Sequence, residues 1–248
     1  MRILLSNDDG IEAPGLARLA AAAAMVSDDV WTVAPEVKHT AAGASLTMAK
    51  PVTMTRLGAQ RYSCSGRPAD CVVAAFAWLF EGQTKPDLVL AGVNDGRNVA
   101  EDLAYSGTLG IAREASFWGV PAVGFSRVKN AAIAASDDAW LAAFIRGLWQ
   151  RRAEWAAEGH WLSVNLPSTL PAAVRQPSIG RDKIARKAEV VEQDGDRTVI
   201  TFPRGRAHGT APGDENEAID SGFVTVNRLN WFGQTRLDDA FVTALRPA

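Results

Sequence analysis

The first sixteen residues constrain the fold most, because they place an apolar strand, a polar turn and a helix start in immediate succession. The apolar run at 3–5 ends at polar residues, which predicts a short buried strand over 2–6. Pro14 suits a first helical turn, and apolar residues at helical spacing follow it, which predicts a helix over 14–27. A strand that leads directly into a helix is the repeating unit of an α/β sheet.

The same alternation continues to about residue 170. We expect further strands over 30–34, 87–91, 120–125 and 162–166, a hairpin over 52–57 and 61–64, and helices over 68–80, 108–118 and 132–151, with polar loops at 36–45 and 92–107. Alternating strands and helices imply a mainly parallel sheet with right-handed crossovers. The predicted fold class is therefore a Rossmann-like, three-layer α/β/α arrangement.

The pattern changes after residue 170. Strands over 188–193 and 197–202 flank Asp194-Gly195 and predict a projecting β-hairpin, which is rarely stable alone and is expected to pack against a second subunit. Residues 203–220 are rich in Gly and Pro and are expected to be irregular. A strand over 223–226 and a closing helix over 237–245 complete the chain. We therefore divide it into a core, 1–170, that carries the active site and an extension, 171–248, exchanged between subunits.

Composition excludes several classes of protein. Hydrophobic residues make up 47% and charged residues 22% of the 248, and the net charge is −2, so no basic surface favours nucleic acid or an anionic membrane. Cys64 and Cys71 are expected to be buried, reduced thiols, and the three histidines form no zinc-binding pair. No signal-peptide pattern opens the chain, so a cytoplasmic location is expected.

Chemistry is first indicated where the opening strand ends, at Asn7, Asp8 and Asp9. Adjacent acids at the carboxyl end of a buried strand repel each other and lose hydration, and a divalent cation offsets that cost. Gly10 permits the bend that lets both acids share one ion. The alternative is that these four residues form only a turn, which their residue types also favour.

Two further loops follow predicted strands, so their polar residues are expected at the same sheet edge. In the first, Thr40 offers a neutral oxygen ligand beside Gly43 and Ser45, although a polar surface loop is the alternative. In the second, Asn94 can give an amide oxygen to a hard cation. Asn98 is equally compatible with a ligand contact and with an Asx-turn.

The second of these loops ends in Ser106, Gly107 and Thr108, directly before a helix. Backbone N–H groups at a helix start attract anions, and two hydroxyls with an unhindered glycine complete a phosphate cradle. A simple N-cap is the alternative, but it explains one residue rather than the whole run.

These motifs, taken in order, resemble the survival protein SurE family of 5′/3′-nucleotidases. The resemblance covers roughly residues 1–126 and continues more weakly beyond them. Its motifs are Ile3-Leu-Leu-Ser-Asn-Asp-Asp-Gly10, Ala13-Pro-Gly15, Ala34-Pro-Glu36, Ser45-Leu-Thr47, Gly66-Arg-Pro-Ala-Asp-Cys71, Gly92-Val-Asn-Asp-Gly-Arg-Asn98, Tyr105-Ser-Gly-Thr108, Val164-Asn-Leu-Pro167 and Ala218-Ile-Asp-Ser-Gly-Phe-Val224.

The resemblance implies a metal-dependent phosphatase of nucleoside monophosphates. It assigns Asp8, Asp9 and Asn94 to the metal, with Thr40 where the family usually has serine, and Ser106 to Thr108 to the phosphate. One Mg²⁺ or Mn²⁺ per subunit is implied, with Ca²⁺ able to take its place in crystals. A homodimer or homotetramer with exchanged C-terminal segments is also implied. The chain departs from the family pattern at 37–41 and at 214–216.

The predicted reaction is hydrolysis of a phosphate monoester by a metal-activated water, with Asp8 or Asp9 able to take its proton. Asn7, Gly43, Ser45 and Asn98 are further candidates for contacts with the substrate. A haloacid-dehalogenase-type phosphatase is disfavoured, because its nucleophile position would be Asn7 and an amide cannot replace a carboxylate. The other alternative is a nucleotide-binding or assembly module with weakened catalysis.

Overall fold

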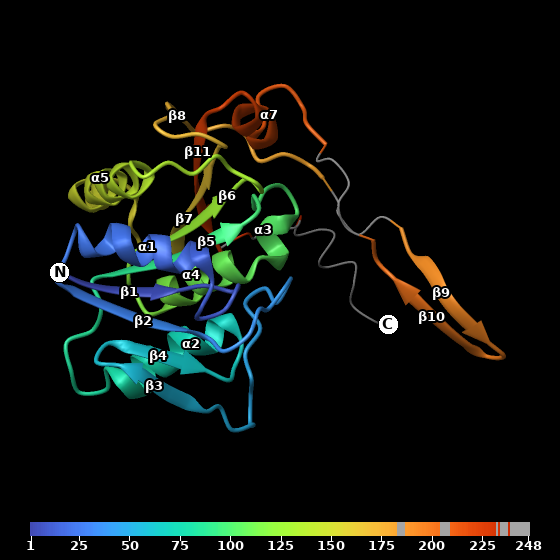
Figure 1. Ribbon diagram of the computed structural model, residues 1–248, viewed down its shortest axis with the longest axis horizontal. Coiled ribbons are helices and arrows are strands. Elements are labelled where there is room, and N and C mark those ends of the chain that lie inside the picture. The colour runs from blue at the N-terminus through green and yellow to red at the C-terminus, as the bar shows by residue number, and fades with distance from the viewer. Residues whose placement is uncertain (183–186, 204–208, 232, 234–237, 239–248) are drawn as a thin grey trace.

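The computed structural model describes residues 1–182, 187–203, 209–231, 233 and 238 (Figure 1). Its strands are β1 (Arg2–Ser6), β2 (Asp29–Pro35), β3 (Met54–Gly58), β4 (Arg61–Cys64), β5 (Leu88–Asp95), β6 (Ala122–Arg127), β7 (His160–Leu166), β8 (Val174–Arg175), β9 (Glu189–Asp194), β10 (Arg197–Thr201) and β11 (Val224–Asn230). Its helices are α1 (Pro14–Ala24), α2 (Pro68–Ala74) with the π-helical continuation η1 (Ala75–Leu79), α3 (Asp102–Tyr105), α4 (Gly107–Phe117), α5 (Asp137–Gln150), α6 (Arg152–Trp155) and α7 (Glu215–Asp220).

One nine-stranded sheet organises the chain, in the order β3-β4-β2-β1-β5-β6-β7-β11-β8. The run from β4 to β7 is parallel throughout, whereas β3 pairs antiparallel with β4 and β11 pairs antiparallel with β7. Because β1 lies between β2 and β5, the turns that follow these three strands lie next to one another at the carboxyl edge.

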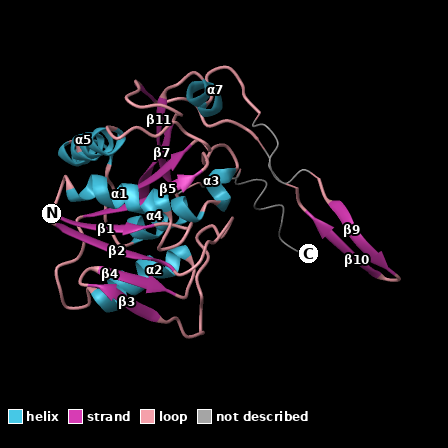
Figure 2. Cartoon of the chain, viewed as in Figure 1, coloured by secondary structure: helices cyan, strands magenta, loops and turns pink. Residues whose placement is uncertain are grey.

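Helices cover both faces of this sheet (Figure 2). The period-two alternation of β1 divides its side chains between two cores. Ile3 and Leu5 pack in a core with Leu19 of α1 and Ile145 of α5, whereas Leu4 packs with residues of α2 and α4, among them Ile111. The predicted three-layer α/β/α fold is confirmed.

Several boundaries differ from the prediction. The strand expected over 87–91 continues as β5 to Asp95, because Gly92, at φ +118°, lets the strand bulge and pair again with β6. The helix expected over 132–151 starts only at Asp137, since the first-turn acids stabilise a helix N-terminus more than the preceding alanines do. The loop expected over 92–107 is accordingly shorter and contains α3.

The C-terminal part confirms the hairpin, because β9 and β10 pair around Asp194 and project away from the main sheet (Figure 1). The irregular segment expected over 203–220 contains α7, which was missed although Asp214 caps it by accepting a hydrogen bond from the Glu217 N–H at 2.8 Å. β8 was not predicted, and β11 is longer than expected. The closing helix expected over 237–245 lies outside the described residues except for residue 238. The division at residue 170 and the exchange of segments stay predictions.

Cys64 and Cys71 are buried and free, which confirms the prediction of reduced thiols. Within the described part of the chain, no helix combines the length and the apolarity that a membrane crossing requires.

A prediction concerns Gly15, which lets the first turn of α1 pack closely against β5. A Cβ at Gly15 would lie 1.9 Å from the carbonyl oxygen of Val93, at the bend of β5, whereas a Cβ at Gly147 of α5 would meet nothing within 4 Å. Gly15→Ala should lower the free energy of unfolding by about 1–3 kcal/mol through overpacking. Gly147→Ala should raise it by about 0.5–1 kcal/mol through helix propensity. Urea unfolding of both variants tests this, and equal stabilisation by the two would contradict it.

Candidate active site at the carboxyl edge of the sheet

The turn after β1 is held by its own polar groups and by the second loop. Asn7 is buried and donates from Nδ2 to the Gly10 carbonyl at 2.8 Å. Gly10 has φ +104°, which a glycine adopts without strain. The His39 N–H donates to the Asp8 carbonyl at 2.7 Å, so the second loop is attached directly to the acid pair. The turn of the alternative interpretation therefore exists, and it positions the two carboxylates.

Asp8 is directed at the start of α4. Its carboxylate accepts a hydrogen bond from the Thr108 hydroxyl at 2.5 Å, and a Cβ at Gly107 would lie only 2.7 Å from the Cβ of Asp8. Burial raises the pKa of Asp8 to about 6, and the nearby charge of Asp9 adds to the rise, while the bond from Thr108 acts against it. The first and third motifs are therefore in direct contact.

Asp9 is directed the other way, toward the end of β5. It accepts a hydrogen bond from the Asp95 N–H at 3.1 Å and forms an ion pair with Lys38. The hydrogen bond to Asp9 raises the pKa of Lys38. Lys38 was not among the sequence candidates, although it lies at one of the positions where the second loop departs from the family pattern.

The two asparagines of the third loop have different environments. Asn94 donates from Nδ2 to the Gly96 carbonyl at 2.8 Å, which orients its amide and leaves the amide oxygen available as an acceptor. Asn98 is buried, and its amide donates to the Ser126 hydroxyl at 2.7 Å. Its backbone exchanges hydrogen bonds with the Asn165 side chain at 2.8 and 3.0 Å. Asn98 thus ties the loop to β6 and β7 in this arrangement.

The second loop reaches the start of α4 through Gly43. Its N–H donates to the Tyr105 carbonyl at 2.8 Å, and Gly110 comes so close to its carbonyl that a Cβ there would lie 2.3 Å away. Ser45 donates its hydroxyl to the Ala42 carbonyl at 2.6 Å, within its own loop. Thr40 is exposed and follows His39, the residue bonded to Asp8.

The run before α4 contains the N-cap of the alternative interpretation, and the phosphate cradle stays a prediction. Ser106 is the N-cap, since its hydroxyl accepts a hydrogen bond from the Leu109 N–H at 3.1 Å. Thr108 is fully buried and holds Asp8 instead. The guanidinium of Arg97, in the loop that follows β5, pairs with Asp220 at 2.7 Å and anchors that loop to α7.

Comparison with known proteins now identifies the family, because residues 3–189 match the family described as Survival protein SurE. The chain belongs to the SurE family. A protein named 5′-nucleotidase SurE from Paramagnetospirillum magneticum is 34% identical over 96% of this chain and 93% of its own length. One of the same name from Rhizorhabdus wittichii is 40% identical over 93% of both chains. The crystal structure of the SurE protein from Aquifex aeolicus superposes with a TM-score of 0.71, at 27% identity, over 98% of this chain and 97% of that one.

SurE membership implies a divalent metal ion, and the residues present fit one. Among the described residues, no three His, Cys, Asp or Glu side chains are grouped to bind a metal, so the two carboxylates would be completed by neutral oxygens. Hard cations accept such ligands. Asn7 Oδ1 is buried beside the acids with no hydrogen-bond partner in the described structure. The cost of ionising the buried Asp8 also fits a nearby cation.

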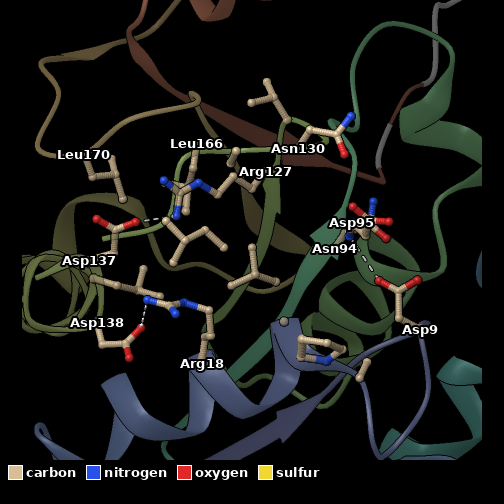
Figure 3. A pocket seen from close by; sticks show the side chains of 18 of the residues that line it. Asp9, Arg18, Asn94, Asp95, Arg127, Asn130, Asp137, Asp138, Leu166 and Leu170 are labelled. Atoms are coloured by element: carbon tan, nitrogen blue, oxygen red, sulfur yellow. Dashed lines mark hydrogen bonds and ion pairs between the residues drawn. The ribbon is translucent and has the colours of Figure 1, made fainter. Parts of the chain in front are cut away.

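A cavity of about 410 Å³ adjoins this SurE site (Figure 3). Asp9, Lys38 and Asn94 line one end of it, and Arg127 and Asp137 line the other. The residues at the far end were not predicted, because Asp137 follows Arg127 by ten positions across a loop and no local motif joins them.

A prediction concerns the hydroxyl of Thr108, which orients Asp8. Thr108→Val should raise the Kd for Mn²⁺ about tenfold, since the carboxylate loses its supporting hydrogen bond. Thr225→Val is the matched control, because Thr225 is equally buried but its hydroxyl has no partner among the described residues. Titration calorimetry with Mn²⁺ measures both, and wild-type affinity in Thr108→Val would show that Asp8 needs no such support.

Proposed function

We propose that this SurE protein is a metal-dependent phosphomonoesterase that hydrolyses nucleoside 5′- and 3′-monophosphates to nucleoside and phosphate. The relatives named 5′-nucleotidase SurE support the substrate class. The observation that carries the proposal is the direct contact of Asp8 with Gly107 and Thr108, which joins an acid pair to the start of a helix. That juxtaposition suits a cation and a phosphate held side by side.

In this proposal Asp8, Asp9, Asn94 and Thr40 hold the metal. When bound, a divalent ion lowers the pKa of a water molecule and neutralises charge on the phosphoryl group. The chain itself binds and orients the substrate. The first N–H groups of a helix have no intrahelical partner, and in α4 these belong to Gly107 and Thr108; the Thr108 N–H is directed at the Asp8 carboxylate. The Gly107 N–H donates to a phosphate oxygen, and the Lys38 ammonium next to Asp9 adds positive charge.

Proton transfer falls to the acid pair. Either carboxylate can accept the proton of the attacking water, because both lie beside the proposed metal position. Asp8 is directed toward α4 and Asp9 toward β5, which supports the proposal that two acceptors flank the metal and the attacking water. In this proposal water and phosphate are held in one geometry, which lowers the entropic part of the reaction barrier.

We further propose Mg²⁺ or Mn²⁺ as the ion, a cytoplasmic location and a homodimer or homotetramer. Apolar side chains on the projecting hairpin support the oligomer, since Val190, Val191 and Ile200 are at least half exposed. The altered segment 37–41 supports the alternative, a nucleotide-binding module with weakened catalysis, because the proposed ligand Thr40 in this segment is exposed. The departure at 214–216 is accommodated structurally, because Glu215 accepts hydrogen bonds from Ala100 and Gly180.

The first prediction from this function is metal-stimulated release of phosphate from nucleoside monophosphates, lost on chelation. Asp8→Asn should lower kcat at least about 100-fold, because one ligand and its orientation are lost together. Asp28→Asn is the control, since Asp28 is exposed and precedes β2 at the opposite sheet edge. Release of inorganic phosphate measures the reaction, and circular dichroism checks the fold. Full activity of Asp8→Asn would remove Asp8 from the site, and no release from any monoester would favour the binding module.

A second prediction tests whether the Thr40 hydroxyl is a ligand of the metal ion. Thr40→Ser keeps the hydroxyl and should change the apparent Mn²⁺ affinity less than about twofold, while Thr40→Ala should weaken it about tenfold. The Mn²⁺ dependence of phosphate release gives both values. If alanine and serine behave alike, the hydroxyl is not a ligand and the ion is held by the other three residues.

A further inference from the structure

Lys38 lies beside the acid pair on an anchored backbone. The N–H of the next residue, His39, donates to the Asp8 carbonyl at 2.7 Å. On the other side Gly10 packs so closely that a Cβ there would lie 3.6 Å from the backbone nitrogen of Lys38. The α-carbon of Lys38 is therefore held in place, and its ammonium changes position by rotation of the flexible aliphatic stem.

The ammonium occupies the carboxylate that a metal ion would need. Lys38 Nζ forms an ion pair with Oδ1 of Asp9, and Oδ2 of the same carboxylate accepts a hydrogen bond from the Asp95 N–H at 3.1 Å (Figure 3). The charges of Asp95 and Asp8 add to the attraction. A divalent ion on Asp9 would repel this ammonium, because two cations at one carboxylate oxygen are unfavourable.

The exposed fractions of the two side chains show which partner can leave. The Lys38 side chain is 54% exposed, whereas that of Asp9 is 10% exposed. Breaking an ion pair whose cation is half in water costs little, because water replaces the lost contact. The ammonium can therefore leave Asp9, while the carboxylate stays in place for another cation.

The other basic side chains that line the cavity have different partners. Arg18 pairs with Asp138 at 2.8 Å, and Arg127 pairs with Asp137 at 2.7 Å. Neither of these carboxylates is a proposed metal ligand. Among the described residues that line the cavity, Lys38 is therefore the one cation that metal binding would release.

We propose that Lys38 alternates between two anions, neutralising Asp9 in the metal-free protein and binding the substrate phosphate once a divalent ion is bound to Asp9. This inference rests on the proposed function, which places a metal on Asp9 and a phosphate next to that metal. The displaced ammonium then lies beside the phosphate and donates to one of its oxygens. Lys38 thereby weakens metal binding in the absence of substrate and strengthens phosphate binding in its presence, so one side chain couples the two ligands.

The first experiment removes the charge and measures metal binding. Lys38→Met keeps an unbranched, flexible side chain without the ammonium. Its Kd for Mn²⁺, measured by titration calorimetry without phosphate, should be about fivefold lower than that of the wild-type protein, because an ion pair no longer competes. An equal or higher Kd would overturn the proposal, since loss of a residue that merely supports the loop would weaken metal binding.

The second experiment measures phosphate binding to the same proteins loaded with Mg²⁺. Lys38→Met should raise the Kd for inorganic phosphate about tenfold, since a charge-assisted hydrogen bond is lost. Lys38→Arg keeps the positive charge and should leave this Kd within about threefold of the wild-type value. Wild-type phosphate affinity in Lys38→Met would show that the ammonium does not bind the phosphate and would overturn the exchange.

Lys129→Met is the matched control, because it removes the same charge from an exposed position that does not line the cavity. Both Kd values should stay within about twofold of the wild-type values, since solvent and salt screen an exposed charge that contacts neither ligand. Equal effects of Lys38→Met and Lys129→Met would mean that only the overall charge matters, and would overturn the exchange.

The proposed function and the exchange fail in different ways. If the wild-type protein releases no phosphate from any monoester, the function fails, yet the Mn²⁺ and phosphate titrations still decide whether Lys38 competes with the metal. If the protein is active but Lys38→Met binds Mn²⁺ no more tightly than the wild type, the function stands and the exchange is wrong.

Discussion

Asp8 lies beneath the first turn of α4, with the Thr108 hydroxyl on its carboxylate and Gly107 against its Cβ. This contact joins β1 to α4 across a hundred residues of sequence, and the other loops are arranged around it. The rise of the Asp8 pKa from 3.8 to about 6 means that keeping the carboxylate ionised costs about 3 kcal/mol without a cation. A cation that binds the folded chain recovers this cost, so the metal affinity and the stability of the site are linked.

The third loop depends on two close backbone approaches. Gly92 has the φ of +118° that the bulge of β5 needs, and a Cβ there would lie 2.2 Å from the Phe125 carbonyl oxygen. Gly15 lets the start of α1 contact the same bend at Val93. Asn94 therefore occupies its place beside Asp9 through packing of β5, β6 and α1. The proposed ligands are held by the rigid sheet and its helices, which suits a site that has to keep a cation and a phosphate in one geometry.

How much of this site the sequence predicts depends on whether each feature is set by neighbouring residues or by contacts between residues far apart in the chain. The strand at 2–6, the acids after it and the helix start at Gly107 are local patterns, and parallel alternation then implies one common edge. The continuation of β5 past Gly92 depends on pairing with β6, which local propensity does not encode. In the sequence, Asn98 and Arg97 belong to a predicted loop, and no local pattern indicates their partners. In the structure Asn98 is bonded to Asn165 and Arg97 pairs with Asp220, so tertiary contacts decide their roles. The cap of α7 at Asp214 was a local signal that the Gly and Pro content around it obscured.

Charge accounts for the asymmetry between the two acids. Asp8 is buried against α4 with neutral hydrogen-bond donors, whereas Asp9 faces Lys38 and the cavity. In the proposed function, a substrate phosphate at the start of α4 would meet the N-terminal end of the helix dipole, and Lys38, paired with Asp9, would add positive charge. Lys38 is more than half exposed, so it can exchange Asp9 for a phosphate oxygen at little cost, while Arg127 is locked to Asp137. The cavity thus has an exposed cation, Lys38, at the end next to Asp9, and a buried, fixed ion pair at its far end.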